Sequence, residues 1–571
     1  MILVFVYLLA TVLFLALLLS LGVQPKLITR LTGVILFVTG VLGTALYGYA
    51  YSVLFPSVPQ AVIRTLFSVF CMFLGRNEIG AISAVPALQT PGMQLLIYAV
   101  HLMALYTTVG YGDTFPVTTL GRIIGVVFQL CSLGLLALAV GAFLALVRGR
   151  LMPRLKLWLG RDRSWYAFSH NTPAARTLAA ALLAREPGAQ IVYAAGAEPG
   201  ADGLYPELSL AQLGAKKAGR GGLSFFCVGP SGSENEVLAR SLAPLGFPVC
   251  CMSRHDPDLA PDNLTFFDPD TCCARLYWQH HPPQSPTERM VIVGDGSSLA
   301  AILEEGLCRN ILDPDQQIQY IVIGDTAAFC RNHPDLALVC DPALGFSDRL
   351  TILDGPWNQD LSLLAGADRL IFCGEDETIT REQLTDLFRY CPVRGVVHAR
   401  LSSPWPGVEV FGAPEELFTP ELVLHGQLDR LARRLHEIYR AKSGGEVPPW
   451  SELSGFTRRS NLASADHLPV KLALLLGREA EITPQACREA WEIFSRTQGE
   501  ARDRLRRIEH LRWTRFHLLN NWHYAPVRDN ARRLHPMLAR FEDLSQADQA
   551  KDDYAWDLLQ TLTQEGESDH V

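Results

Sequence analysis

The residues whose types most suggest chemistry form one short run of small, hydroxyl-bearing and aromatic side chains. The run reads TTVGYGD at 107–113, and its centre is Thr108, Val109, Gly110, Tyr111 and Gly112. Glycine tolerates backbone angles that a Cβ forbids, so successive carbonyl oxygens can face one axis and replace the water around a cation. One loop cannot surround an ion, and the motif therefore implies a ring of four. The alternative is a glycine-containing turn that carries this pattern by chance.

This run resembles the selectivity filter of potassium channels, and its surroundings extend the resemblance. A Thr-Pro pair, typical of a helix start, precedes residues 93–106, which are expected to form the pore helix. Residues 120–147 are expected to form the inner helix, with Gly134 as the candidate gating hinge or, equally, a site of close helix packing. The resemblance implies a homotetrameric, potassium-selective channel in which residues 91–116 form the pore loop.

Charge and hydropathy divide the chain at about residue 160. The first 160 residues hold 9 of the 50 Lys/Arg and 2 of the 58 Asp/Glu. The rest of the chain therefore holds 41 Lys/Arg and 56 Asp/Glu. Apolar runs at 1–23 and 31–55 are long enough to span a bilayer. Basic residues between and after the apolar runs favour the cytoplasmic side. We therefore expect a multi-pass domain in the inner cell membrane over 1–160 and a cytoplasmic part over 161–571; the path of 56–92 stays open.

A second chemically suggestive run, MVIVGDGSSLA at 290–300, follows the pattern of a strand entering a helix. In a dinucleotide fingerprint, Gly294 and Gly296 would let a pyrophosphate approach the helix N-terminus. Asp325, after the next expected strand, could hold a ribose hydroxyl, although it lies farther downstream than is usual. A nucleotide such as NAD is therefore a candidate ligand. The alternative is a tight turn without a ligand.

Short apolar segments alternate with helical ones from 161 to 440, which predicts doubly wound α/β units with parallel sheets. Strands are expected at 165–169, 190–194, 223–228, 248–252, 290–294, 319–323, 370–373 and 395–398. A pore followed by two such units resembles channels with RCK domains, the regulators of potassium conductance. The resemblance implies a first unit at 161–285, degenerate because its opening turn lacks glycines, and a second Rossmann-like unit at 286–440.

The C-terminal part, residues 448–571, follows a Gly/Pro linker and is expected to be all-α. Its runs EHLRW at 509–513 and NWHY at 521–524 resemble the RyR domain, the repeat of ryanodine receptors. The resemblance implies a small anionic or aromatic ligand, such as a nucleotide-derived second messenger, held by guanidinium forks and stacking faces. The candidate ligand-binding residues are Arg459, Asn461, Lys471, Glu509, His510, Arg512, Trp522 and Arg528. The alternative is that they hold the helices together.

Other classes of function find little support in the sequence. The acidic soluble part does not favour nucleic acid as a partner. The sequence lacks a paired acid and base, a GxSxG motif and a GKS/T phosphate loop, so neither an enzyme nor a catalytic residue is predicted. The 13 cysteines show no metal-ligand spacing, so no metal site is predicted. The prediction is a potassium channel gated by a small nucleotide-like ligand. The alternatives are a membrane-depolarising defence or stress effector and, less favoured, a membrane-anchored nucleotide-dependent enzyme.

Overall fold

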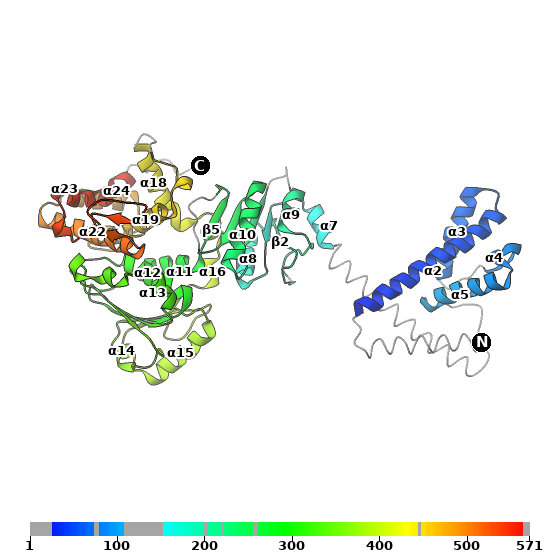
Figure 1. Ribbon diagram of the computed structural model, residues 1–571, viewed down its shortest axis with the longest axis horizontal. Helices are drawn as coiled ribbons and strands as arrows, with labels where there is room; N and C mark the ends of the chain where they lie inside the picture. The colour runs from blue at the N-terminus through cyan, green and yellow to red at the C-terminus, as the bar shows by residue number, and fades with distance from the viewer. Residues whose placement is uncertain are drawn as a thin grey trace. The chain divides into compact units, whose positions relative to one another are not determined.

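The computed structural model describes residues 25–73, 79–107, 152–198, 200, 202–217, 222–254, 261–442 and 447–563 (Figure 1). The chain divides into two compact units, Met1–Leu155 and Lys156–Val571. The filter candidate at 108–112, the hinge candidate Gly134, the expected first span and the expected inner helix lie outside the described residues.

The described part of the first unit is helical. Its elements are α2 (Pro25–Leu54), α3 (Val58–Phe73), α4 (Ile79–Ser83), the 3-10 turn η1 (Pro86–Leu88) and α5 (Pro91–Thr107). α2 covers the expected second span, and its segment Phe37–Leu54 is the one stretch among the described helices that is long and apolar enough to cross a membrane. α5 covers the residues expected to form the pore helix.

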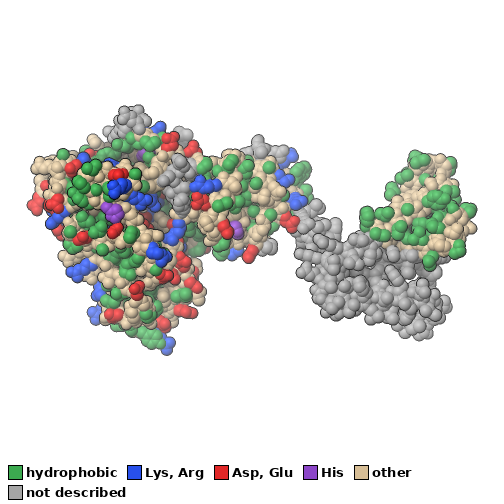
Figure 2. Space-filling view, in the orientation of Figure 1, with side chains coloured by type: hydrophobic (Ala, Val, Ile, Leu, Met, Phe, Trp, Pro, Cys, Tyr) green, Lys and Arg blue, Asp and Glu red, His purple; other side chains and the backbone are tan. Residues whose placement is uncertain are grey.

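A histidine braces α5 against α2. Nε2 of His101 lies 2.9 Å from the hydroxyl oxygen of Tyr47, and Nδ1 lies 2.7 Å from the carbonyl oxygen of Ile97. On the outer faces, Phe37 and Leu95 are 72% and 70% exposed. Figure 2 shows that hydrophobic side chains dominate the visible surface of this unit. Such a surface is stable against lipid or other subunits rather than against water.

The second unit begins within the short helix α7 (Met152–Leu159) and continues with a five-stranded parallel sheet of order β2-β1-β3-β4-β5. The strands are β1 (Trp165–Phe168), β2 (Gln190–Tyr193), β3 (Leu223–Cys227), β4 (Val249–Met252) and β5 (Leu264–Phe267). α8 (Pro173–Arg185) packs on one face, and α9 (Leu210–Lys217) and α10 (Gly232–Leu242) pack on the other. A single β-bridge places Leu204 beside β2, where the third strand of a six-stranded doubly wound sheet would lie.

A six-stranded parallel sheet follows, with the order β11-β10-β9-β6-β7-β8. The strands are β6 (Arg289–Gly294), β7 (Gln319–Gly324), β8 (Arg349–Leu353), β9 (Arg369–Phe372), β10 (Val396–Arg400) and β11 (Glu409–Phe411). Numbered from β6, this is the 3-2-1-4-5-6 order of dinucleotide-binding folds. The expectation of doubly wound parallel sheets is thus confirmed.

Helices cover both faces of the six-stranded sheet (Figure 1). α11 (Pro269–His280) and α12 (Gly296–Arg309) share one core with β6 and β7, and α13 (Ala327–Asn332) joins the same core through Phe329. α14 (Leu361–Ala365) and α15 (Glu377–Tyr390) pack on the other face. Parallel strands covered on both faces must be apolar throughout, which is why most of them were visible in the sequence.

After β11 the chain returns to the first sheet, in what we call the return segment, residues 414–428. Its helices are α16 (Pro414–Leu417) and α17 (Pro420–Val423), and both contact α8. Leu422 and Val423 belong to the same core as Phe168. Apolar residues of the return segment thus complete the core of the first Rossmann-like unit, although they fall within 286–440, the extent expected for the second.

The C-terminal part is mainly helical and docks on the second α/β unit. α18 (Arg430–Lys442) precedes it, and its main helices are α19 (Gly455–Asp466), α20 (Leu468–Leu476), α21 (Pro484–Arg496), α22 (Glu500–Leu519), α23 (Gln546–Gln549) and α24 (Tyr554–Leu562). One short parallel pair, β12 (His523–Tyr524) with β13 (Leu534–His535), departs from the all-α expectation. Leu511 and Trp556 share a core with α12, so these helices cover the α12 side of the second sheet.

Candidate functional site

The strand order of the second sheet reverses between β6 and β9, and doubly wound sheets bind ligands beyond the carboxyl ends of the strands at this point. Gly294 ends β6 there, and a Cβ on it would lie 2.9 Å from the carbonyl carbon of Cys373. Gly296 begins α12 with φ of +58°, in the left-handed region that favours glycine. The geometry of the turn therefore explains both glycines without a ligand.

A carboxylate of the protein occupies the N-terminus of α12. Oε1 of Glu375, which follows β9, accepts hydrogen bonds from the backbone N–H and the hydroxyl of Ser297 at 2.7 and 2.8 Å. The backbone N–H of Glu375 in turn donates to Oδ1 of Asp295 at 2.8 Å. This carboxylate satisfies the helix N-terminus that would otherwise attract a phosphate. A phosphate-bearing ligand must displace Glu375 to bind as the fingerprint predicts.

Asp325 follows β7, the strand beside β6, and is exposed. Its Oδ1 accepts a hydrogen bond from the N–H of Ala327 at 3.1 Å. The end of the second strand is where dinucleotide folds carry the acid that holds a ribose. The structure thus brings Asp325 to the same sheet edge as Gly294 and Gly296, with its carboxylate engaged at the start of α13.

A cavity of about 1110 Å³ lies along α12, and three parts of the chain line it. The first α/β unit contributes Arg254 and Asp268. The second unit contributes Gly296, and the polar residues from this unit and the C-terminal helices include Ser297, Glu304, Glu305, Arg458, Arg459 and Asp466. Phe329, Trp450 and Phe516 add aromatic surface. The volume is large enough for a nucleotide-sized molecule.

Arg275 on α11 ties the walls of this cavity together. Its Nε and Nη2 donate to the two carboxylate oxygens of Asp466 on α19 at 2.7 and 3.1 Å. Its Nη1 donates to Oδ1 of Asp429 at 2.8 Å, and the side chain is 7% exposed. Charged groups paired in this forked way and shielded from water are costly to separate. The arginine therefore fixes α19 against the junction of the two α/β units.

Two neighbouring carboxyl groups of α12 line the cavity. Burial raises the pKa of Glu305 to about 8, and the charge of Asp466 adds to the rise. Partial burial also raises the pKa of Glu304, whose side chain is 45% exposed, against the opposing charges of His333 and Arg459. At neutral pH the Glu305 carboxyl is therefore largely protonated and can donate a hydrogen bond to a ligand. The sequence did not reveal this pair, because its burial requires the C-terminal helices to cover α12.

Arg459 is the one predicted C-terminal ligand residue that lines the cavity. Its side chain is exposed, and its charge acts on Glu304. Asn461 lies on the same helix, α19, and is half-buried, but it is not among the residues that line the cavity. The structure therefore brings Arg459 together with Gly296, a candidate from the second α/β unit, at one cavity.

Lys471, Glu509 and Arg512 instead form a buried ion triad. Oε2 of Glu509 lies 2.9 Å from Nζ of Lys471, and Nε and Nη2 of Arg512 donate to the Glu509 carboxylate at 2.6–3.1 Å. The three residues are at most 3% exposed. Burial alone would raise the pKa of Glu509, but the charges of Arg512 and Lys471 hold it well below its usual value. This geometry favours the packing alternative for all three.

The remaining three candidates lie apart from the cavity. His510 is buried, with Nε2 2.8 Å from the carbonyl oxygen of Ala539. Trp522 is buried, with its ring centre 5.1 Å from that of Phe456. Arg528 is exposed and lines a separate pocket of about 670 Å³. The structure therefore does not gather the eight candidates into one site.

Arg515 is an important residue that sequence reasoning missed. It is fully buried, and its Nη2 donates to Oδ2 of Asp348 at 2.9 Å while its Nε donates to the carbonyl oxygen of Val339 at 3.0 Å. It therefore anchors α22 to the second α/β unit. Arg515 follows Arg512 by three residues, so both lie on one face of the helix. This spacing was the signal in the sequence that could have identified Arg515.

Residues 92–148 match a family model described as an ion channel. The match begins within α5 and includes the filter candidate, and it identifies a channel domain that places the chain in a membrane. No curated protein matches the chain. Among solved structures, the chain is similar to quinate dehydrogenase from Corynebacterium glutamicum in complex with NAD, with 14% sequence identity and a TM-score of 0.24. The alignment covers 59% of this chain and 99% of the dehydrogenase chain. A likeness this weak carries no argument about function.

Proposed function

We propose that the chain is a subunit of a homotetrameric, potassium-selective channel. The observation that carries the proposal is the run TTVGYGD inside the residues that match an ion-channel family. Backbone carbonyls at such a run replace the hydration shell of potassium, and four chains are needed to complete the ring. The preceding helix α5, whose carboxyl end meets the run, supports the proposal, because its dipole favours a cation there.

The same proposal assigns control of the pore to a small nucleotide-like ligand in the cavity along α12. Two doubly wound sheets after a pore support the likeness to RCK domains, and the C-terminal helices would act as an RyR-like sensor. Because the cavity walls come from three parts of the chain, a bound ligand favours one arrangement of these parts over others. Only a difference in affinity between open and closed arrangements can gate a pore.

Within the cavity, Arg459 and the N-terminus of α12 would bind the anionic groups of the ligand, after Glu375 has been displaced. The protonated Glu305 carboxyl would donate to an acceptor on a base or sugar. Trp450, which is half-buried, offers a face on which a base could stack.

Potassium flux from liposomes that hold the purified full chain tests both parts of the proposal, with a panel of nucleotides that includes NAD. Gly110→Asp should abolish the flux, because a carboxylate side chain would obstruct the ring of carbonyls. Arg459→Ala should weaken the nucleotide response at least tenfold, while Arg496→Ala, at a side chain that is 81% exposed and outside the cavity, should leave it unchanged. Equal flux of sodium and potassium would refute selectivity, and equal responses of the two arginine variants would refute the cavity.

A further inference from the structure

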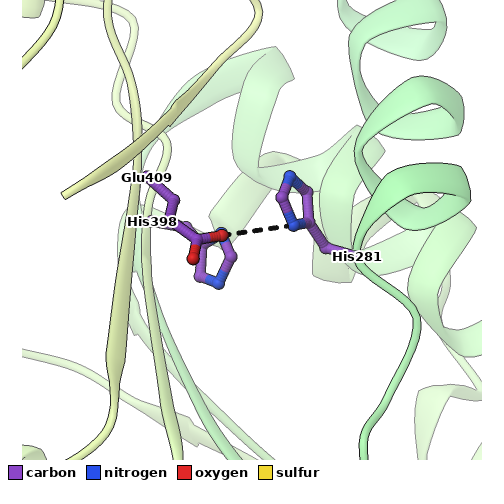
Figure 3. Close-up of side chains that lie close together, drawn as sticks. All are labelled: His281, His398 and Glu409. Carbon is purple, nitrogen blue, oxygen red and sulfur yellow. Dashed lines mark ion pairs between the residues drawn. The ribbon is translucent and has the colours of Figure 1, made fainter.

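Two histidines and one glutamate come together at an edge of the second sheet, away from the cavity (Figure 3). His281 is the first residue after α11, where the chain passes from the first α/β unit to the second. His398 on β10 and Glu409 on β11 are in-register partners on neighbouring parallel strands, so their side chains project from the same face of the sheet. The nearest ligand atoms of all three residues lie within 4.8 Å of one another.

We propose that His281, His398 and Glu409 bind one divalent transition-metal ion of the zinc class. Imidazole nitrogen and carboxylate oxygen are preferred zinc ligands, with bonds of about 2.0–2.2 Å, so two ligand atoms of a tetrahedral site lie about 3.4 Å apart. Oε2 of Glu409 lies 3.5 Å from Nδ1 of His281 and 3.7 Å from Nδ1 of His398. Two edges of the tetrahedron are thus nearly in place before a metal binds.

The surroundings of His398 support binding of a metal ion. The residue is 3% exposed, and its Nδ1 has no hydrogen-bond partner within the described part of the chain. A buried nitrogen without a partner is costly, and its 3.7 Å separation from Glu409 is too long for a hydrogen bond. A metal ion between these two atoms would satisfy both.

Arg369 holds the backbone of His281, and its positive charge, which would oppose a cation at the site, is paired with a carboxylate. The carbonyl oxygen of His281 accepts a hydrogen bond from Nη1 of Arg369 at 2.6 Å, and the Arg369 charge is paired with Glu288 at 2.7 Å. The Glu409 side chain is 56% exposed, so the site opens to solvent and leaves room for a water as the fourth ligand. The sequence could not reveal the set, because its members are separated by 117 and 11 residues.

A metal here would join the linker after α11 to the outer strands of the second sheet. None of the three residues lines the proposed ligand cavity. Zinc would thus restrain the junction between the two α/β units.

Equilibrium dialysis of the chelator-stripped full chain in detergent against Zn²⁺, followed by metal analysis, tests the proposal. We expect the wild type to hold one more zinc than Glu409→Gln, or to hold it at least tenfold more tightly, and His281→Gln to match Glu409→Gln. His280→Gln is the matched control, since His280 is the adjacent histidine, 55% exposed and outside the set; it should bind as the wild type does.

Cobalt spectroscopy provides a second measurement that does not depend on zinc bound elsewhere. Co²⁺ in the wild type should give the visible absorption of a tetrahedral nitrogen and oxygen site, and Glu409→Gln should lose it. Equal zinc binding by wild type and Glu409→Gln would overturn the proposal, as would a cobalt spectrum dominated by thiolate charge transfer, which would assign the metal to cysteines.

Discussion

Replacing Glu509 with glutamine distinguishes a structural triad from a ligand-binding one. The Glu509 carboxylate lies between Lys471 and Arg512, and all three side chains are at most 5% exposed. Glutamine has nearly the same shape, so the change removes charge while keeping volume. The triad then passes from a net charge of +1 to +2 inside the protein.

The expected cost follows from this loss of compensation. Removing one partner of a buried ion pair costs about 3–5 kcal/mol, because an unpaired charge stays buried. Lys471→Met leaves the forked pair of Arg512 and Glu509 intact and should cost far less, since methionine can pack on Trp556, which now lies under the Lys471 ammonium at 5.5 Å. In the double variant the two effects should not add.

Thermal unfolding of the purified full chain, followed by tryptophan fluorescence, measures these costs. At about 2–4 °C per kcal/mol, Glu509→Gln should lower the Tm of the transition by about 6–20 °C. Glu489→Gln is the matched control: its side chain is 52% exposed, pairs with Arg478, and should shift the Tm by no more than about 2 °C.

The pH dependence adds a check of sign. Because the folded pKa of Glu509 lies below the ordinary value, its stabilisation is present above about pH 4.3 and is lost as the pH falls below it. Glu509→Gln should therefore show a weaker decline of Tm in acid than the wild type. A Tm within 2 °C of wild type, combined with a lost nucleotide response, would refute the structural assignment and return Glu509 to the ligand site.

Three further predictions concern Arg515, Glu305 and Glu375. Arg515→Lys should destabilise the chain by about 2–4 kcal/mol, because lysine cannot reproduce the fork to Asp348 and Val339; thermal unfolding equal to wild type would contradict this anchoring role. Because the pKa of Glu305 is raised, stability falls as the pH rises from about 4.3 to 8. Glu305→Gln should therefore flatten the dependence of Tm on pH across this range, and an unchanged slope of Tm against pH would contradict the raised pKa. Glu375→Gln should cost about 1 kcal/mol by weakening the cap of α12, yet increase the thermal shift caused by inorganic phosphate; no increase would mean that this helix end does not accept anions.

The sequence was sufficient for most of the two sheets, because strands covered on both faces must be continuously apolar. Eight expected strands coincide with β1–β4, β6, β7, β9 and β10. The three that were missed give weaker signals: β8 is partly exposed at every position, β11 has three residues, and β5 has two half-buried positions among its four. Edge strands with solvent on one side lose the apolar pattern that sequence reading depends on.

The candidate site was less predictable, because its decisive contacts join distant residues. Gly296 is recognisable from its motif, but the Glu375 carboxylate that meets Ser297 comes from a residue 78 positions later. Arginine and glutamate occur both in ligand sites and in buried pairs, so residue type alone could not separate Arg459 from Arg512. The difference arises from which helix face packs against α12.

The return segment also sets an order of events during synthesis. The ring centre of Phe418 lies 5.8 Å from that of Phe267, and Leu422 and Val423 complete the core beneath α8. Phe418, Leu422 and Val423 are nevertheless synthesised after the entire second sheet. At about 5–20 residues per second, the ribosome needs roughly 10–30 s to pass from the end of the first sheet to the end of this segment. During that interval the face of the first sheet that α8 covers lacks the apolar residues that complete its core. A chain released before residue 428 would therefore leave the ribosome with an unfinished core and a surface that chaperones recognise.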